Sequence, residues 1–398
     1  MNKQILNPFI NNFFAFLFIL NALIDPANEL FHFKVVSFFL FLLFSINKIG
    51  FPIKFILFFS GIYFILFLSS SIMILSDNKY DMSFFLNYST TFITLLLLFY
   101  GKAIDFFKYY VFASIVISLV TIIISVFFIF FPEASIIIST LPSSKAIFQL
   151  AFSKKVLFWD FISVFHKSAP ILVIPFSFFW DQYLRKKKIK YLSLSILIGL
   201  ALFFSGTRAN ILSLFLIFFL VSLFFLYKVK QKLLTTVLLF LFVSFFSFLA
   251  IYLLFTVKNT SSVAKDGHLL SYIELFAEKP SIILFGQGPG SLFFSKGFNK
   301  FTPNTELTYL ELIRMFGIFS TFFFISFYFY PLLVLLRSRK LYSIGIGYLA
   351  YLFIAGTNPF LFGPQGFISL VISYQFACSV NKRGIRFDNF SNNCNIQS

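Results

Sequence analysis

The string from Ser205 to Arg208 carries the clearest chemical signal in the sequence. It separates two apolar runs with little room for a loop, so Arg208 is expected at or inside the bilayer boundary, where desolvation is costly without an anion. A tight turn at Gly206 would leave free backbone N–H groups at the next helix start, beside the guanidinium. This combination suits a phosphate or diphosphate. A snorkelling arginine that marks a helix end is the alternative.

Glu306 and Arg314 form a second candidate pair. On one helix they would share a face about two turns, or about 12 Å, apart. Glu306 at the lip of a cleft could then accept a proton, while Arg314 deeper in the groove holds an anion. Two simpler interpretations compete with this one. The positive end of a helix capped by Thr305 favours an acid at Glu306, and Arg314 could pair with Glu311 on the same helix.

The segment 258–304 lies between these motifs and contains Lys265 and His268. His268, Ser271 and Tyr272 follow helical spacing (i, i+3, i+4), which places them on one face of a helix. This pattern predicts an amphipathic helix that lies over the outer surface of the membrane.

The glycine-rich run at residues 286–290 lacks the strand, helix and acidic partner of a dinucleotide site, and no Lys-Ser/Thr pair follows it as in a P-loop. Nucleotide binding is therefore not expected. A turn that re-enters the membrane is one interpretation of the run. The other is a backbone that a ligand approaches closely at Gly288 and Gly290.

His166 and Lys167 place a titratable ring and an ammonium group at the start of another apolar run. They could contact a substrate, but an anchor at the membrane edge is the simpler explanation. The acidic residues of the chain are scattered, and none forms a paired-aspartate motif. No metal site and no cofactor are therefore expected.

The composition sets the elements that must position these residues. The 398 residues are 59% hydrophobic, 22% aromatic and only 12% charged, which leaves too few polar side chains to cover a water-soluble fold. We therefore exclude a soluble enzyme and predict one all-α polytopic integral membrane domain over residues 1–398. At about 20 apolar residues per crossing, the chain has room for about 12 transmembrane helices.

Apolar runs between Pro, Gly and charged residues define the expected spans. They cover residues 9–24, 33–47, 53–75, 84–100, 108–131, 161–180, 191–205, 208–227, 233–256, 309–336, 341–356 and 366–380. Two long segments remain, 132–160 and 258–304, the second between spans nine and ten. Segments of this length in a compact protein usually carry function.

The charge distribution orients these spans. With the N-terminus in the cytoplasm, every short inside connection carries at least two basic residues, among them the Arg185–Lys190 cluster. Both termini are therefore expected in the cytoplasm, and both long segments on the periplasmic side. This orientation accounts for much of the formal net charge of +18, so no nucleic-acid partner is expected. The basic cluster would lie against anionic headgroups of the lipid bilayer.

In this order, the motifs of the second half resemble those of the O-antigen polymerase and O-antigen ligase superfamily, multispan bacterial enzymes with a GT-C-related membrane fold. Ser205–Ala209 is similar to the family's small-residue-plus-arginine motif at a helix start, and Asp266–His268 with the run 286–290 resembles its amphipathic outer segment. Glu306–Gly317 resembles the segment that ligases begin with His-Asn, where the polymerase branch commonly has Thr-Glu, as this chain does. Phe165–Lys167 resembles a further motif near the sixth span.

The resemblance implies polymerisation of undecaprenyl-diphosphate-linked oligosaccharide repeat units on the periplasmic face of the bacterial inner membrane, by metal-independent glycosyl transfer. Glu306 would act as general base, and Arg208 and Arg314 would stabilise the developing diphosphate charge. Contacts to phosphate or sugar would come from Lys265, His268, Gly288, Gly290, His166 and Lys167.

Two alternatives stay open. An O-antigen ligase, or another lipid-linked glycosyltransferase, would share the fold, but the ligase histidine is absent and His268 stands where many relatives carry arginine. A lipid-linked oligosaccharide flippase also has about a dozen spans. Flippases place their charges in a central cavity and usually show two related halves, whereas the distinctive charges here gather at one face. A chain-length regulator protein is a further partner that the sequence leaves open.

Overall fold

The structure, a computed structural model, describes residues 3–26, 33–46, 53–75, 79–100, 104–134, 148–156, 159–242, 244, 260–358 and 361–381. The N-terminal part contains α1 (Lys3–Ile24), α2 (Lys34–Ser45), α3 (Ile53–Leu75), α4 (Met82–Thr91), the 3-10 helix η2 (Phe92–Tyr100) and α5 (Phe106–Phe130). The central part contains β1 (Phe148–Val156), β2 (Trp159–His166), η3 (Ala169–Leu172), α8 (Val173–Lys186), α9 (Ile189–Phe204) and α10 (Arg208–Lys228). The C-terminal part contains α12 (Thr260–Glu278), α13 (Ser281–Phe285), β3 (Phe293–Ser295), β4 (Lys300–Thr302), α14 (Thr308–Arg337), α15 (Tyr342–Gly356) and α16 (Pro364–Asn381).

Five helices among the described residues are long and apolar enough to cross a membrane. They are Ile56–Leu75, Met82–Tyr100, Phe106–Phe130, Arg208–Lys228 and Thr308–Arg337. Five shorter apolar helices accompany them: Ile10–Ile24, Lys34–Ser45, Ile189–Phe204, Lys232–Phe242 and Tyr342–Gly356. A mainly helical chain with helices long and apolar enough to span a membrane is therefore confirmed, while about 12 spans remains a prediction. The expected span 233–256 lies partly outside the described residues.

One expected helical segment is a strand. β2 pairs antiparallel with β1, so that Phe148 lies opposite His166 and Val156 opposite Trp159. The expectation of a helical span at 161–180 is wrong for its first part, because α8 begins only at Val173. Trp, Phe, Ile and Val favour strands, and periodicity does not distinguish a short apolar strand from a buried helix.

Helix α14 is broken near its start. Gly317 has non-helical backbone angles (φ 74°, ψ 169°), which glycine adopts without a steric penalty. The break frees the carbonyls of Arg314 and Met315 from helical partners, and the glycine-rich run replaces them. The N–H of Gln287 donates to the Arg314 carbonyl (2.7 Å), and the N–H of Gly288 donates to the Met315 carbonyl (2.9 Å). Residues 308–316 thus form a short half-helix held by that run.

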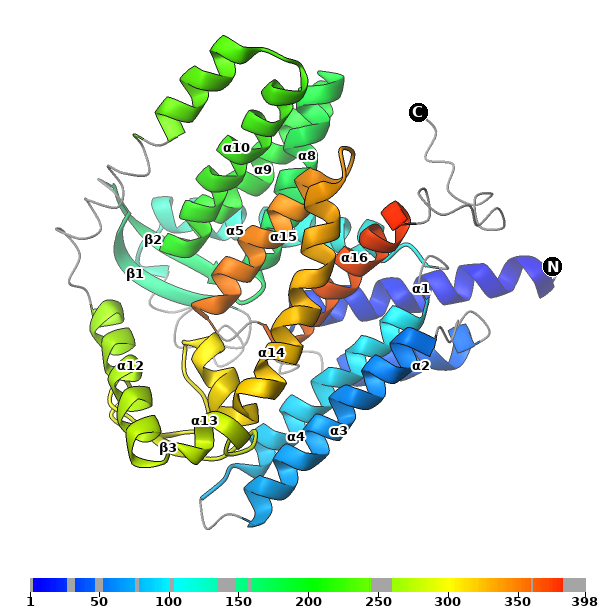
Figure 1. The fold of residues 1–398 in the computed structure, drawn as a ribbon. Helices are drawn as coiled ribbons and strands as arrows, with labels where there is room; N and C mark the ends of the chain where they lie inside the picture. The colour runs from blue at the N-terminus through cyan, green and yellow to red at the C-terminus, as the bar shows by residue number, and fades with distance from the viewer. Residues whose placement is uncertain are drawn as a thin grey trace.

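Helix α15 lies inside the bundle, where it packs against α8, α10 and α14 (Figure 1). Its tyrosines Tyr348 and Tyr351 are fully buried. At Gly347 the helix approaches α8 closely, because a Cβ there would lie only 2.8 Å from the Cα of Ile174. This close packing fixes the ends of α10, α14 and α15 relative to one another.

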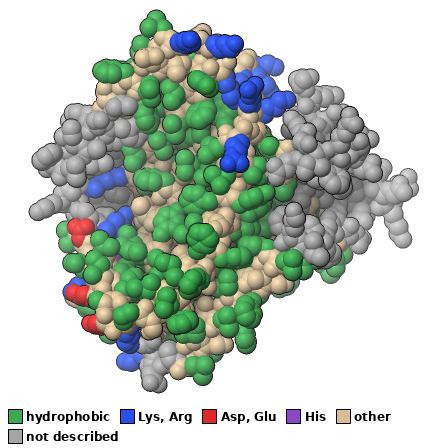
Figure 2. All heavy atoms as spheres, in the orientation of Figure 1, with side chains coloured by type: hydrophobic (Ala, Val, Ile, Leu, Met, Phe, Trp, Pro, Cys, Tyr) green, Lys and Arg blue, Asp and Glu red, His purple; other side chains and the backbone are tan. Residues whose placement is uncertain are grey.

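The surface is apolar around the middle of the bundle (Figure 2). The upper end carries Lys and Arg side chains without acidic ones in this view, whereas Lys or Arg side chains are mixed with Asp and Glu toward the lower left (Figure 2). On α14, Phe319 and Phe322 are 74% and 73% exposed. Large exposed rings of this kind suit contact with lipid. The basic end contains the α8–α9 connection and the ends of α10 and α14, whereas α12, α13 and the start of α14 lie at the other end (Figure 1).

Candidate functional site

Lys265 and Glu306, from two separate segments, face each other at the end of the bundle opposite to the basic end. The Nζ atom of Lys265 on α12 lies 3.8 Å from Oε2 of Glu306, which directly precedes α14. The same Nζ donates to the backbone carbonyl of Thr357, just after α15 (3.3 Å). Both side chains are about one-third exposed, so they stay accessible to a ligand.

Two hydrogen bonds hold the start of α14 against the end of α15. Thr308 Oγ1 donates to the Asn358 carbonyl (2.8 Å), and the Tyr309 hydroxyl donates to the Leu352 carbonyl (3.1 Å). Glu306 lies before the first residue of this helix. The expectation that Glu306 and Arg314 share a helix face is therefore corrected, because the helix begins only at Thr308.

Thr305 also differs from its expected role as helix cap. The capping position of α14 is Leu307, without a side-chain cap hydrogen bond. Thr305 Oγ1 instead accepts a hydrogen bond from the Leu307 N–H (3.3 Å), in the turn before the helix. This local turn keeps the backbone around Glu306 out of the helix and leaves its carboxylate at the edge of the fold.

Arg208 begins α10, as the sequence predicts. Gly206 has a φ of +64°, which confirms the tight turn, and Thr207 at the capping position makes no side-chain cap hydrogen bond. Arg208 is exposed and has no hydrogen bond or ion pair within the described part of the chain. An uncapped helix start with a free guanidinium is a suitable place for an anion.

The Arg208 turn and the Lys265–Glu306 pair lie at the same end of the bundle. Helices α10 and α15 pack side by side, and the far end of α10 is fixed by Lys228, whose Nζ lies 3.7 Å from the ring centroid of Tyr342. Because Tyr342 begins α15, the two helices run in opposite directions. Arg208 is therefore on the side where α15 ends and where Lys265 contacts Thr357 (Figure 1).

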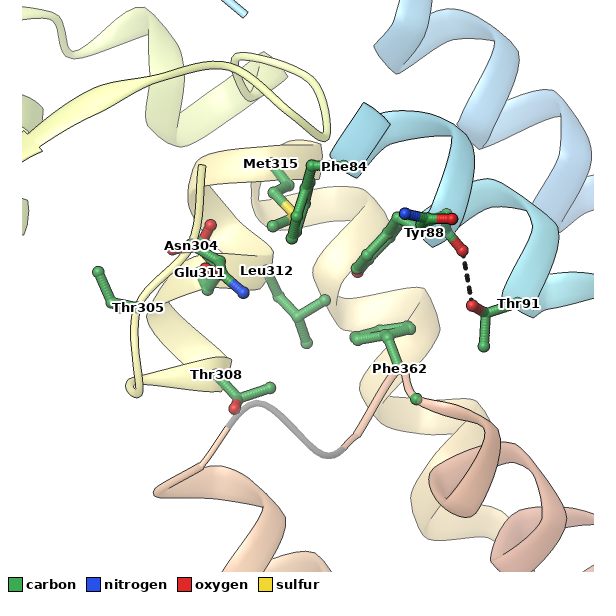
Figure 3. A pocket seen from close by; sticks show the side chains of 12 residues that line it. Phe84, Tyr88, Thr91, Asn304, Thr305, Thr308, Glu311, Leu312, Met315 and Phe362 are labelled. Atoms are coloured by element: carbon green, nitrogen blue, oxygen red, sulfur yellow. Dashed lines mark hydrogen bonds between the residues drawn. The ribbon is translucent and has the colours of Figure 1, made fainter. Parts of the chain in front are cut away.

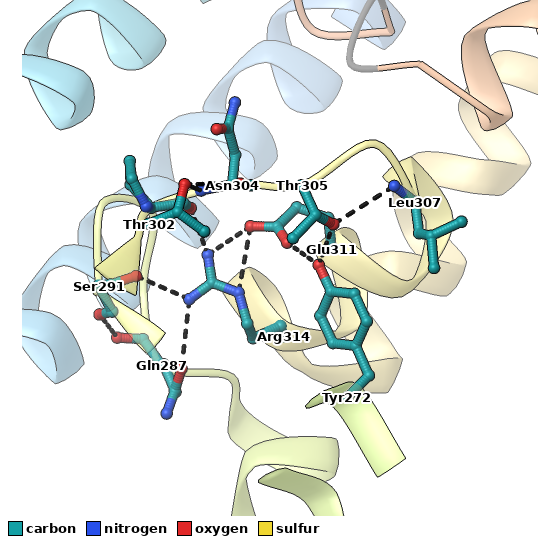
Figure 4. A network of polar contacts seen from close by, with 10 residues as sticks. Tyr272, Gln287, Ser291, Thr302, Asn304, Thr305, Leu307, Glu311 and Arg314 are labelled. Carbon is teal, nitrogen blue, oxygen red and sulfur yellow. Dashed lines mark hydrogen bonds and ion pairs between the residues drawn. The ribbon is translucent and has the colours of Figure 1, made fainter. Parts of the chain in front are cut away.

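Arg314 is fully buried inside a polar network (Figure 4). Its Nε donates to Glu311 Oε1 (3.1 Å), and a second nitrogen forms an ion pair with the same carboxylate. The remaining contacts are to Gln287 Oε1 (3.2 Å) and to the carbonyls of Ser291 (2.8 Å) and Pro303 (2.5 Å). We correct the expectation that Arg314 holds a substrate anion, since its donors are already used inside the protein.

Tyr272 and Glu311 complete this network. The Tyr272 hydroxyl donates to Glu311 Oε2 and lies 2.7 Å from Thr305 Oγ1. Burial, together with the Glu311 carboxylate, raises the pKa of Tyr272 well above its usual value, so the hydroxyl keeps its proton. The sequence pattern placed Tyr272 on the same helix face as His268, and gave Glu311 only as an alternative partner of Arg314.

A cavity of about 190 Å³ lies beside the network (Figure 3). Glu311 lines it from α14, and two aromatic rings, Phe84 and Tyr88, line it from α4. Asn87 and Asn304 add side-chain amides. Aromatic walls with a few polar groups are typical of small-molecule pockets. The spacing of these residues does not predict the cavity, because α4 and α14 are far apart in the sequence.

His268 lies on the buried face of α12 with Ser271 and Tyr272, which confirms the predicted helix with these three residues on one face. Its Nδ1 is 2.7 Å from Ser295 Oγ, and its ring contacts Phe298 at a centroid distance of 4.3 Å. Nε2 is buried with no hydrogen-bond partner. Burial lowers the pKa of His268, so the neutral ring is favoured and offers no fixed positive charge to a phosphate.

The structure places His166 inside the protein, at the end of β2. Its Nδ1 accepts a hydrogen bond from the Ser168 N–H (3.0 Å), and burial lowers its pKa to about 4. A neutral, enclosed ring does not fit the expected contact to substrate. Lys167 is half-buried and stays a candidate. Strand β2, which ends just before Lys167, lies against the Arg208 turn, because a Cβ on Gly206 would meet the Cβ of Ser163 at 2.3 Å.

Gly288 and Gly290 approach the protein itself. A Cβ on Gly288 would lie 2.4 Å from the Ser69 carbonyl oxygen of α3, and a Cβ on Gly290 would lie 2.9 Å from the carbonyl oxygen of Asp81. The expectation that a ligand approaches these glycines is corrected, since helices α3 and α4 occupy that space. The run serves packing and the break in α14.

No family model matches the chain, and no curated protein and no solved structure is similar to it.

Proposed function

We propose that the chain is a membrane glycosyltransferase that polymerises undecaprenyl-diphosphate-linked oligosaccharide repeat units. In this proposal it lies in the bacterial inner membrane with a GT-C-related arrangement, both termini in the cytoplasm, and the end with Arg208, Lys265 and Glu306 facing the periplasm. The observation that carries the proposal is a partly exposed carboxylate, Glu306 paired with Lys265, at the same end of an apolar bundle as the exposed guanidinium of Arg208.

The reaction needs one base and one anion site. An acceptor sugar hydroxyl attacks the anomeric carbon of the donor sugar, its proton passes to Glu306, and the bond from that carbon to the diphosphate oxygen breaks. Undecaprenyl diphosphate leaves with the bonding electron pair. Glu306 is suited to the base role because its carboxylate is partly exposed and bound only loosely, with Lys265 Nζ at 3.8 Å.

The leaving diphosphate requires positive charge on side chains that are exposed enough to contact a ligand. Arg208 supplies a planar, bidentate donor next to an uncapped helix start, and Lys265 supplies an ammonium group. Lys167 follows the strand that packs on the Gly206 turn and adds a third cation. In the low dielectric of a membrane surface, fixed donors of this kind stabilise developing negative charge without a metal ion.

The 190 Å³ cavity is suited to the sugar of one substrate. Its rings, Phe84 and Tyr88, can stack on a sugar face, and the amides of Asn87 and Asn304 can bond hydroxyl groups. Arg314 binds Glu311, which lines the cavity, and the carbonyl of Pro303, which precedes the lining residue Asn304. Arg314 is thus a positioning residue for this cavity, and Glu306 with Arg208 does the chemistry.

Reconstitution tests the proposal. Purified protein in liposomes receives undecaprenyl-diphosphate repeat units, without nucleotide and without added metal, and the glycans are separated by size. A ladder of longer chains is expected. Transfer of glycan to lipid A core or to a protein acceptor, without a ladder, would indicate a ligase. Movement of the lipid-linked unit between leaflets without new glycosidic bonds would indicate a flippase.

A further inference from the structure

A large basic cavity lies at the opposite end of the bundle, far from the candidate active site. Its volume is about 1050 Å³, at the top of the range of about 300–1,000 Å³ in which small-molecule pockets fall. It is open to the surface and is lined by the end of α10, the helix Lys232–Phe242 and the connection from α14 to α15. The proposed glycosyl transfer makes no use of it.

The charge on its wall is of one sign. The cations lining the cavity are Lys228, Lys230, Lys232, Arg337 and Arg339, and no Asp or Glu lines it within the described residues. Lys228 Nζ donates to the Arg339 backbone carbonyl, which leaves its charge uncompensated. Lys230, Lys232 and Arg337 have no ion pair among the residues that the structure describes.

The nearest buried acid is already neutralised by other groups. Asp181 on α8 accepts hydrogen bonds from the hydroxyl of Tyr342 (2.6 Å) and from Ser343 Oγ (3.2 Å), and pairs with Arg185 Nε (2.8 Å). The ring of Tyr342 then forms part of the cavity wall under the Lys228 ammonium group. A cavity with this wall attracts an anion, because no acidic side chain in its described lining neutralises the positive charge.

Apolar side chains surround the mouth of the cavity. Phe224, Tyr227 and Leu336 add apolar surface to the lining. Leu233 and Leu234, which follow the lining residue Lys232, and Leu333, one turn before Leu336, are exposed. A phosphate-bearing headgroup could enter the cavity while the attached acyl chains lie along these side chains. This arrangement matches a phospholipid better than a free phosphate, which would gain nothing from the apolar rim.

We propose that this cavity binds the headgroup of an anionic phospholipid. The negative phosphate lies among Lys230, Lys232 and Arg337, and the acyl chains cover Leu333 and the neighbouring apolar surface. Bound lipid would join the end of α10, the helix Lys232–Phe242 and the connection from α14 to α15, whose like charges otherwise repel each other.

The experiment measures lipid binding by native mass spectrometry on protein released from detergent micelles. The probes are phosphatidylglycerol, phosphatidylcholine with the same acyl chains, and inorganic diphosphate. The test variant is the triple change Lys230→Gln, Lys232→Gln and Arg337→Gln. The matched control is the triple change Lys186→Gln, Lys188→Gln and Lys190→Gln, which removes equal charge from exposed residues at the same end but outside the cavity.

Wild-type protein is expected to retain phosphatidylglycerol at least about tenfold more tightly than phosphatidylcholine, since each nearby cation contributes measurably to anionic lipid binding. The cavity triple should lose this preference and the control triple should keep it. Equal loss in both triples would overturn the proposal in favour of general surface charge. Binding of diphosphate as tight as that of phosphatidylglycerol would overturn the lipid assignment.

The single change Lys230→Gln serves if the triple variant does not fold. It is expected to weaken phosphatidylglycerol binding about threefold to tenfold. Phosphatidylglycerol binding that is unchanged in a folded Lys230→Gln protein would also overturn the proposal. Equal binding of phosphatidylglycerol and phosphatidylcholine by the wild-type protein would overturn it as well.

Discussion

Lys265 Nζ lies 3.8 Å from Glu306 Oε2, although the two residues belong to different segments of the chain, and both remain partly exposed. The neighbouring pair, Arg314 with Glu311, is also close but fully enclosed. The first pair can therefore exchange its partner for a substrate, whereas the second cannot do so without unfolding the start of α14. The predictions for Glu306 and Arg314 follow from this difference in exposure.

Glu306→Gln is expected to lower chain extension by about 10² to 10⁴ fold, because the amide cannot accept the acceptor proton. The protein should fold normally, since the carboxylate is at the edge of the structure. The ladder assay measures the effect, with Glu278→Gln on the exposed side of α12 as control. A Glu306→Gln protein that makes full-length polymer would remove Glu306 from the mechanism.

Arg314→Ala is expected to destabilise the fold by about 3 to 5 kcal/mol, because it leaves the buried Glu311 carboxylate without its cation. Thermal unfolding of the purified protein in detergent measures this loss. Arg208→Ala serves as the comparison, since Arg208 is exposed and should leave stability unchanged while reducing activity. Equal stability of the two variants would show that the Arg314 network is not structural.

Tyr272→Phe is expected to cost about 1 to 3 kcal/mol, because Glu311 and Thr305 each lose the same hydroxyl partner in a buried setting. The control is Tyr227→Phe, at a tyrosine that is exposed. The midpoint of thermal unfolding reports both. A Tyr272→Phe protein as stable as wild type would mean that the network tolerates water at this position.

Gly317→Ala is expected to destabilise the protein by at least about 2 kcal/mol. The φ of +74° strains any side chain, and a Cβ would lie 2.1 Å from the Leu284 carbonyl oxygen. Gly61→Ala in α3 is the control, because its Cβ would meet Phe323 at an ordinary 3.6 Å and alanine favours helix. Similar stability of both variants would argue against the break in α14.

Stability should fall between about pH 6.5 and pH 4. Burial depresses the folded-state pKa of His166 to about 4, below the unfolded value near 6.5, so the unfolded chain binds more protons in this window. The native state is thus fully favoured above pH 6.5 and loses stability as the pH falls. Burial lowers the pKa of His268 too, which adds in the same direction.

A pH series of unfolding midpoints measures this loss, and a His166→Gln variant should show a flatter curve between pH 4 and 6.5. The nearby charges of Asp25 and Lys167 are kept in that variant, so they cannot produce the difference. An unchanged curve would mean that His166 is accessible to protons in the folded protein.

Sequence patterns predicted the parts of the site that depend on local geometry. The turn at Gly206, the helix that starts at Arg208 and the shared helix face of His268, Ser271 and Tyr272 follow from residue type and spacing, and the structure confirms them. The half-helix 308–316 and the packing of Gly288 did not follow from spacing. They depend on contacts between α13, α14 and α3, which no local pattern contains.

Two errors have the same physical origin. The sequence predicts the start of a helix where β2 lies, because a short run of Trp, Phe, Ile and Val fits both a strand and a helix. Glu306 was placed on a helix with Arg314 because helical spacing assumes the helix begins early, and the Thr305 turn delays it to Thr308. In both places tertiary contacts decided between alternatives that the sequence left open.

The most direct test is binding of undecaprenyl diphosphate to Arg208 variants. We predict that Arg208→Ala weakens the Kd by about tenfold to a hundredfold, that Arg208→Lys recovers only part of the loss because a point charge cannot replace a bidentate fork, and that Lys188→Ala has no effect. An Arg208→Ala protein that binds the diphosphate lipid as tightly as wild type would contradict the assignment of this end of the bundle as the substrate site.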